Sequence, residues 1–261
     1  MKANRWRGLA AMAGLMLAAH AGTAVAQIRV LTSGGFAAPL NAALPAFEKS
    51  AGIAVTVMLG KSQGSDPAAI GAQLRRGVAA DVVIMSREGL DDLKSENRVI
   101  PGSDVDLART PLGMAVKAGA PKPDIATVEA FKNALLRAKS ITYPSSTTGI
   151  YMATRLFPQL GIAKELAPKS TNAGVAAVAK GEAEIAIQPV SELLHVPGTD
   201  FVGTIPHSIQ YISVFSAAIV AGQSTSDQSN YEKARQLINF LHSEKAADAI
   251  RNSGMEPLGS R

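Results

Sequence analysis

The stretch "VLTSGGFAAPLNAALPAFEKSAGIAV", residues 30–55, predicts how the chain begins to fold. A short apolar run ends at Ser33, Gly34 and Gly35, a helical pattern follows, and a second apolar run begins at Ile53. The apolar residues of the helical pattern recur at the spacing of one helix face: Phe36, Leu40, Leu44 and Phe47. We therefore expect a strand, a helix and a second strand. The unpaired N–H groups of the helix N-terminus would then follow directly after the first strand.

The same alternation of strand-like and helix-like segments continues along the chain. Further strands are expected at residues 53–59, 81–85, 140–144 and 183–189. Helices are expected from Asp66 to Gly77, around Leu90, and at 127–138, 148–160 and 173–180, and a C-terminal helical stripe contains Leu237, Ile238 and Leu241. Two extended runs, 108–124 and 211–222, interrupt the pattern. This order predicts an α/β fold with parallel strands, in which the extended runs cross between two domains.

The first 26 residues have the pattern of a secretory signal peptide. Basic residues precede an apolar run that ends in Ala24, Val25 and Ala26, a small-x-small cleavage pattern. We expect cleavage after Ala26 and export to a bacterial periplasm. We expect no stable membrane insertion, because small and polar residues dilute the apolar run below the roughly 20 apolar residues of a membrane span.

Composition argues against several other classes of protein. The chain contains no cysteine, so it has neither disulfides nor the thiol of a lipoprotein anchor. Three of the 26 Lys and Arg residues and none of the 21 acidic residues lie in the predicted signal peptide, which leaves the remaining chain at about +2. Aromatic residues are few and no basic run is interleaved with them, so nothing indicates nucleic-acid binding.

Small polar residues follow the predicted strands. The junctions read TSGG after the first strand, GKSQGS after the second, SR after the third, PSSTTG in the second half and QPVS after the last. In open parallel sheets, ligands bind beyond the carboxyl ends of the strands, where helix N-termini offer N–H donors and a partial positive charge. Each junction alone is explained by ordinary turn chemistry. Five junctions that face one cleft would form a binding site for an anion.

The order and spacing of these segments resemble the periplasmic molybdate-binding protein family. The resemblance covers nearly all of the mature chain and includes the junctions above and KGEAEIAIQP at 180–189. It implies the fold of a type II periplasmic binding protein, with two αβ lobes, two crossover segments and a ligand cleft between the lobes. The predicted lobes are residues 27–110 with 212–261, and residues 111–211. A monomer is also implied.

Carried over by position, the resemblance implies ligand-binding residues in both lobes. Gln188 stands where the family has a tyrosine, and the family binds its dianion with neutral groups, whereas this chain has Lys61 and Arg87 at two junctions. A guanidinium binds a carboxylate through two hydrogen bonds and an ammonium adds a point charge, so several carboxylates suit this site better than one oxyanion. The predicted binding residues are Ser33, Gly34, Lys61, Ser62, Ser86, Arg87, Ser145, Thr147 and Gln188.

The resemblance leaves two functions open. The periplasmic aconitate isomerases form one branch that is similar to this family. Membership of this branch would imply a tricarboxylate substrate, a 1,3-proton shift that converts trans-aconitate to cis-aconitate, and no cofactor. The alternative is a receptor that delivers a small organic anion, or molybdate, to an ABC permease. The enzyme needs a general base near the bound carbon skeleton, and the receptor does not.

The sequence does not identify the residue that would act as this general base. His207, just before the second extended run, is a weak candidate, and the histidines do not cluster at metal-ligand spacing. The GKS at 60–62 is not a phosphate-binding loop, because the first glycine of that motif would fall at Val55. The sequence therefore predicts no metal site and leaves the catalytic residue unidentified.

Overall fold

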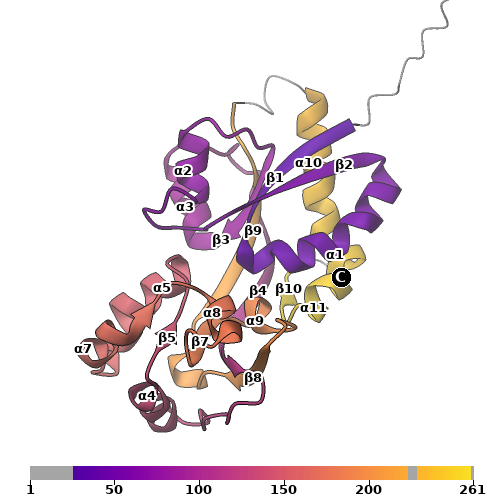
Figure 1. The fold of residues 1–261 in the computed structure, drawn as a ribbon. Coiled ribbons are helices and arrows are strands. Elements are labelled where there is room, and N and C mark those ends of the chain that lie inside the picture. Colours follow the sequence, from indigo (N-terminus) through magenta and orange to yellow (C-terminus); the bar gives the residue numbers. More distant parts are fainter. Residues whose placement is uncertain (1–25, 223–227, 260–261) are drawn as a thin grey trace, which may run out of the picture.

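The computed structural model describes residues 26–222 and 228–259. These residues form two αβ lobes joined by extended segments (Figure 1). The predicted signal peptide, residues 1–26, lies outside the described residues except for Ala26, which begins the first strand.

The first lobe is built from both ends of the described chain. Its strands are β1 (Ala26–Ser33), β2 (Ile53–Gly60), β3 (Val82–Ser86), β9 (Ile212–Ile219) and β10 (Glu256–Pro257). Its helices are α1 (Gly34–Ala51), α2 (Ile70–Arg75), α3 (Arg87–Ser95), α10 (Gln228–Leu241) and α11 (Glu244–Asn252).

The second lobe is built from the middle of the chain, which enters it through β4 (Val105–Lys117). Its other strands are β5 (Ile141–Thr142), β6 (Ser170–Thr171), β7 (Ile185–Pro189) and β8 (Thr199–Thr204). Its α-helices are α4 (Val128–Arg137), α5 (Thr147–Tyr151), α6 (Phe157–Gln159), α7 (Ala163–Leu166), α8 (Val175–Lys180) and α9 (Val190–Leu193). A π-helix (Met152–Leu156) joins α5 to α6, and 3-10 turns occupy Ala167–Lys169 and His207–Ile209.

One long strand connects the two lobes. Within the described residues the strand order is β2-β1-β3-β9-β4-β7-β5-β6, and β8 and β10 also pair with β4. The pairs of β1 with β2 and β3, and of β5 with β6 and β7, are parallel. Residues 105–111 of β4 pair with β9, whereas residues 112–117 pair with β7 and β8. This strand therefore carries the chain from the first lobe into the second.

Helices cover both faces of the first-lobe sheet, as Figure 1 shows. Successive side chains of β3 alternate between the faces, so Val82 and Ile84 join the cluster with α1, α10 and α11, whereas Val83 and Met85 join the cluster with α2 and α3. All five residues of β3 are buried. A strand covered on both faces reads as a continuous apolar run, which is why this segment was recognisable in the sequence.

The second lobe has its own apolar cores. The larger cluster lies between residues 112 and 209, and a smaller one packs under α8 and α9. No core cluster of the described residues mixes the middle segment with the two outer segments. The lobe boundaries predicted at 110/111 and 211/212 remain a proposal that agrees with this division.

The longest predicted helices form where the apolar spacing indicated. The helix α1 buries Phe36, Leu40, Leu44 and Phe47, and it is terminated by the C-cap residue Gly52, whose φ of +67° is favourable for glycine. The helix predicted at 127–138 is α4, and the Thr127 hydroxyl caps it by accepting the Ala130 N–H at 3.1 Å.

Two predicted elements are much shorter in the structure. The helix α2 begins at Ile70 and not at Asp66. The Asp66 carboxylate accepts the Ala68 N–H at 2.7 Å and a hydrogen bond from the Lys61 ammonium, and these bonds hold residues 66–68 in a turn. The strand predicted at 140–144 keeps strand geometry only at Ile141–Thr142. Among the described residues, no helix has the length and apolar character needed to cross a membrane.

Candidate ligand-binding site

A cavity of about 220 Å³ lies between the lobes. Its walls come from the ends of the strands β1, β2, β3, β5, β6 and β7 with the segments that follow them, and from the strand β9. The lining residues are Ser33, Gly34, Gly60, Lys61, Ser62, Ser86, Pro144, Ser145, Ser146, Thr147, Thr148, Asn172, Ala173, Gly174, Pro189, Glu192, Ser213 and Phe215. The junctions that the sequence singled out thus meet at one place.

The N-terminus of α1 forms one wall. Ser33 is the N-cap of this 18-residue helix, yet its side chain makes no capping bond, and its buried Oγ has no hydrogen-bond partner among the described residues. The first N–H groups of a helix have no partner within the helix and carry partial positive charge. This wall therefore offers a hydroxyl and backbone donors to an anion.

A chain of hydroxyls crosses from the first lobe to the second. The Ser62 Oγ accepts the Ser86 N–H at 2.9 Å, and the Ser86 and Thr147 hydroxyl oxygens lie 2.8 Å apart. Because the Thr147 hydroxyl donates to Gln63 Oε1 at 2.9 Å, its only proton is engaged, and Ser86 must donate to Thr147. The lobes are thus held together by the same side chains that line the cavity.

Lys61 supplies positive charge to this wall. It follows β2, and its Nζ lies 2.5 Å from Asp66 Oδ2 and 2.9 Å from the Ser145 Oγ of the second lobe. Its side chain keeps 36% of its exposure, so the ammonium is within reach of both solvent and the cavity. Among the described residues that line the cavity, Lys61 is the only one with a cationic side chain.

A second contact between the lobes lies outside the cavity. The Tyr211 hydroxyl donates a hydrogen bond to the Glu88 carboxylate on α3, and its ring stacks on Tyr151 with the centroids 4.8 Å apart. Burial, followed by the nearby Glu88 carboxylate, raises the pKa of Tyr211, which keeps the phenol protonated as the donor. This pair ties α3 to the segment that returns from the second lobe.

Seven of the nine predicted binding residues line the cavity: Ser33, Gly34, Lys61, Ser62, Ser86, Ser145 and Thr147. The structure does not bring Arg87 or Gln188 into the lining. His207, the weak candidate for a base, lines a different cavity beside Thr127 and Pro206.

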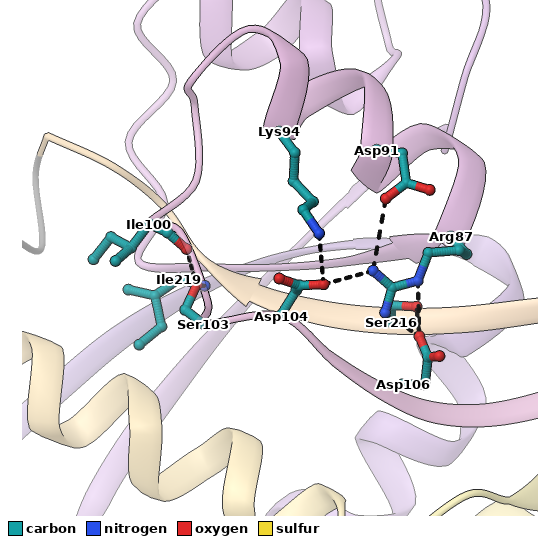
Figure 2. A network of polar contacts seen from close by, with 9 residues as sticks. All are labelled: Arg87, Asp91, Lys94, Ile100, Ser103, Asp104, Asp106, Ser216 and Ile219. Atoms are coloured by element: carbon teal, nitrogen blue, oxygen red, sulfur yellow. Dashed lines mark hydrogen bonds and ion pairs between the residues drawn. The ribbon is translucent and has the colours of Figure 1, made fainter.

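Arg87, the first residue of α3, is held by three aspartates, as Figure 2 shows. Its guanidinium donates to Asp104 at 2.7 Å and to Asp106 at 2.8 Å, and Asp91 lies 3.7 Å away. Asp106 also accepts from the Ser216 hydroxyl at 2.6 Å. This network ties α3 to the start of β4 and to β9, so Arg87 has a structural position, which corrects its placement in the ligand site.

Gln188 reaches the cavity only through a neighbour that the sequence analysis missed. Its Nε2 donates to Glu192 Oε2, and its own Oε1 is buried without a partner among the described residues. Glu192 lines the cavity from α9, the short helix after β7. Burial raises the pKa of the Glu192 carboxyl, while the hydrogen bond from Gln188 lowers it to a smaller extent. The sequence indicated the junction QPVS as part of the site, but Glu192, the next residue, belongs to no pattern that would have marked it.

The site has no arrangement suited to a metal ion. The described residues contain no group of three or more His, Cys, Asp or Glu side chains that could hold one. The lining is mostly hydroxyls and glycine or alanine backbone, with Lys61 and Glu192 as its two ordinarily charged side chains.

Two αβ lobes around a cavity of strand-end hydroxyls define the class of two-lobed solute-binding proteins. The chain belongs to the family of bacterial extracellular solute-binding proteins, whose model matches residues 28–256. It is also 38% identical over 255 residues to an aconitate isomerase from Pseudomonas sp, a match that covers 95% of both chains. The predicted family relationship is therefore confirmed.

Solved structures of low sequence identity share the fold. The periplasmic molybdate-binding protein of Azotobacter vinelandii matches with a TM-score of 0.64 and 19% identity, covering 87% of this chain and 98% of that one. The tungstate-binding protein TupA of Desulfovibrio alaskensis G20 matches with a TM-score of 0.60 and 14% identity, covering 90% and 100%. At these identities the likeness concerns the fold alone, and it confirms the predicted two-lobed architecture.

Proposed function

We propose that this protein is a periplasmic aconitate isomerase that converts trans-aconitate to cis-aconitate. The observation that carries the proposal is the 38% identity to the Pseudomonas enzyme over 95% of both chains. The cavity supports it, because hydroxyls, a helix N-terminus and an ammonium converge from two lobes on a space suited to a small anion.

The reaction moves one proton and one double bond. A base removes a proton from the methylene carbon of trans-aconitate, the electron pair spreads over the allyl unit and its carboxylates, and a proton returns to the other end of the allyl unit. Substrate and product are isomers, so the reaction needs no electron acceptor. Donors that face the substrate carboxylates stabilise the enediolate-like charge that develops in the transition state.

The proposed binding residues are the seven predicted ones that line the cavity. Lys61 neutralises one carboxylate, and the α1 N-terminus with Ser33 and Gly34 donates to a second. The remaining donors come from the hydroxyl chain of Ser62, Ser86, Ser145 and Thr147. Arg87 is not included, because its guanidinium is already paired with Asp104 and Asp106.

The test is to incubate the purified mature protein with trans-aconitate and to follow cis-aconitate by proton NMR, whose vinyl signal distinguishes the isomers. The expected result is approach to the same equilibrium mixture from either isomer, at a rate proportional to protein concentration. The absence of conversion at high protein concentration, with folding verified by circular dichroism, would contradict the proposal.

The family and its oxyanion-binding neighbours favour a second candidate function, a receptor for a small anion that works with an ABC permease. A receptor would be stabilised thermally by its ligand and would convert nothing, since ligand binding to the native state raises the melting temperature. Stabilisation by molybdate but not by carboxylates would identify an oxyanion receptor. Either function agrees with a monomer exported by a cleaved signal peptide, which we also propose.

A further inference from the structure

Glu192 is an unexpected residue for a cavity that binds an anion. Among the described residues that line the cavity, it is the only acid. A carboxylate at this place repels a bound carboxylate, which weakens a site built only for binding. Nothing in the packing requires the charge there, because the side chain makes no ion pair with a described residue. Its presence therefore indicates a chemical role.

The two oxygens of the Glu192 carboxyl have different surroundings. Oε2 accepts a hydrogen bond from Gln188 Nε2, which fixes the orientation of the group. Oε1 makes no hydrogen bond with a described residue, and it lies 3.3 Å from the position that a Cβ would take at Gly34. One oxygen is thus anchored while the other is free, and it lies beside the N-terminus of α1, where the proposed substrate carboxylate binds.

The absence of a side chain at Gly34 permits this approach. A Cβ there would come within 3.3 Å of Oε1 and 4.0 Å of the carboxyl carbon, so the carboxyl would have to shift by a few tenths of an ångström to accommodate it. The carboxyl comes from the second lobe and the glycine from the first. The arrangement therefore exists only where the two lobes meet.

The surroundings also suit a group that must both take and return a proton. Burial raises the pKa of the Glu192 carboxyl, so its protonated form costs less free energy than that of an exposed carboxylate. The other candidates are less suitable. Lys61 is paired with the Asp66 carboxylate, and His207 lines a different cavity.

We propose that Glu192 is the general acid-base residue of the isomerisation, and this inference rests on the proposed function. The Glu192 carboxylate removes a proton from the methylene carbon, so that an O–H bond forms as the C–H bond breaks. The electron pair becomes the new double bond as the old one opens. The resulting carboxylic acid returns the proton to the carbon at the far end of the allyl unit, which restores the carboxylate and balances the reaction.

The test compares Glu192→Gln with the wild-type protein. The amide keeps the size of the side chain but cannot act as the base, so kcat should fall by about 100- to 10,000-fold. The dissociation constant for trans-aconitate, measured by calorimetry, should stay within about tenfold of the wild-type value, because the lost carboxylate repels the ligand and does not bind it. Glu182→Gln, an exposed acid of the same lobe outside the cavity, should keep the wild-type rate.

The outcomes separate this inference from the proposed function. A wild-type protein that does not isomerise aconitate would remove both. If the wild-type protein is active and Glu192→Gln has a kcat within tenfold of the wild-type value, only the proposed role of Glu192 is overturned. If Glu192→Gln does not fold, Glu192→Asp decides, because moving the carboxyl back by one methylene should lower kcat by more than tenfold with binding retained. An unchanged kcat in that variant would also overturn the role.

Discussion

Replacing Lys61 by methionine removes the cationic side chain of the cavity lining and leaves a side chain of similar length. The ammonium lies 2.9 Å from the Ser145 hydroxyl, so it can reach a ligand held between the lobes. Two unit charges about 4 Å apart interact by roughly 4 kcal/mol at an effective dielectric constant of about 20. Asp66 already offsets part of this charge and the side chain is 36% exposed, so the net contribution must be smaller.

The expected loss is therefore that of a hydrogen bond to a charged group, about 1.5–3 kcal/mol. This corresponds to a dissociation constant for trans-aconitate that is roughly 10- to 150-fold higher. Isothermal titration calorimetry at low and high salt measures it. Wild-type binding should weaken as salt increases, and Lys61→Met should be less sensitive, because salt screens an exposed charge.

Two control variants isolate the charge. Lys245→Met removes the same charge from an exposed position on α11 outside the cavity, and it should bind as the wild type does. Ser145→Ala keeps the ammonium but removes its contact with the second lobe and one of the proposed ligand-binding hydroxyls, so its effect on binding should be about 1 kcal/mol. Binding by Lys61→Met within twofold of the wild type would refute the role of this ammonium in ligand binding.

Two further predictions concern stability. Gly149→Ala should lower the free energy of unfolding by about 1–3 kcal/mol in urea titrations, because its Cβ would lie 1.8 Å from the backbone oxygen of Pro144. Gly71→Ala, whose Cβ would meet only side-chain ends at 3.3 Å or more, is the control, and an equal loss in both would contradict the reasoning. The hydrogen bond from the Lys94 ammonium, with a smaller contribution from Arg87, lowers the pKa of Asp104. The stability that the ionised Asp104 contributes to the fold is therefore complete above about pH 4 and is lost as the pH falls through the lowered pKa. Asp104→Asn should therefore flatten the loss of stability below about pH 4, measured by urea unfolding from pH 6 to pH 2.5, and an unchanged slope would be the contrary result.

Segments with a strong local signal were predictable from the sequence. The helix α1 follows from four apolar residues on one face, and α4 begins within one residue of its predicted start because Thr127 caps it. The parallel pairing of β1 with β2 and β3, and of β5 with β6 and β7, also follows, since buried parallel strands read as continuous apolar runs. The antiparallel pairs that β4 and β9 make were not predicted. In these segments the relevant interactions lie within a few residues of one another.

The partners of charged residues were not predictable. Lys61 and Arg87 occupy equivalent places after β2 and β3, two strands that are consecutive along the chain, and their local sequences do not distinguish them. The choice depends on Asp104 and Asp106, which lie 17 and 19 residues after Arg87 and reach it only because β4 returns beside α3. A long cationic side chain at such a junction can point toward the cleft or away from it, and the position of the nearest carboxylates determines its direction.

The strands and helices with strong apolar patterns and the small polar residues at the strand ends can be read from the sequence, because they are local patterns. Their order and spacing along the chain indicate the family. Which charged side chains face the cavity depends on how the two lobes pack together. Glu192 and Gly34 are 158 positions apart, and no periodicity connects them, yet the carboxyl of one lobe packs against the helix N-terminus of the other. Such a contact depends on how the two lobes pack, and this packing is set by distant residues.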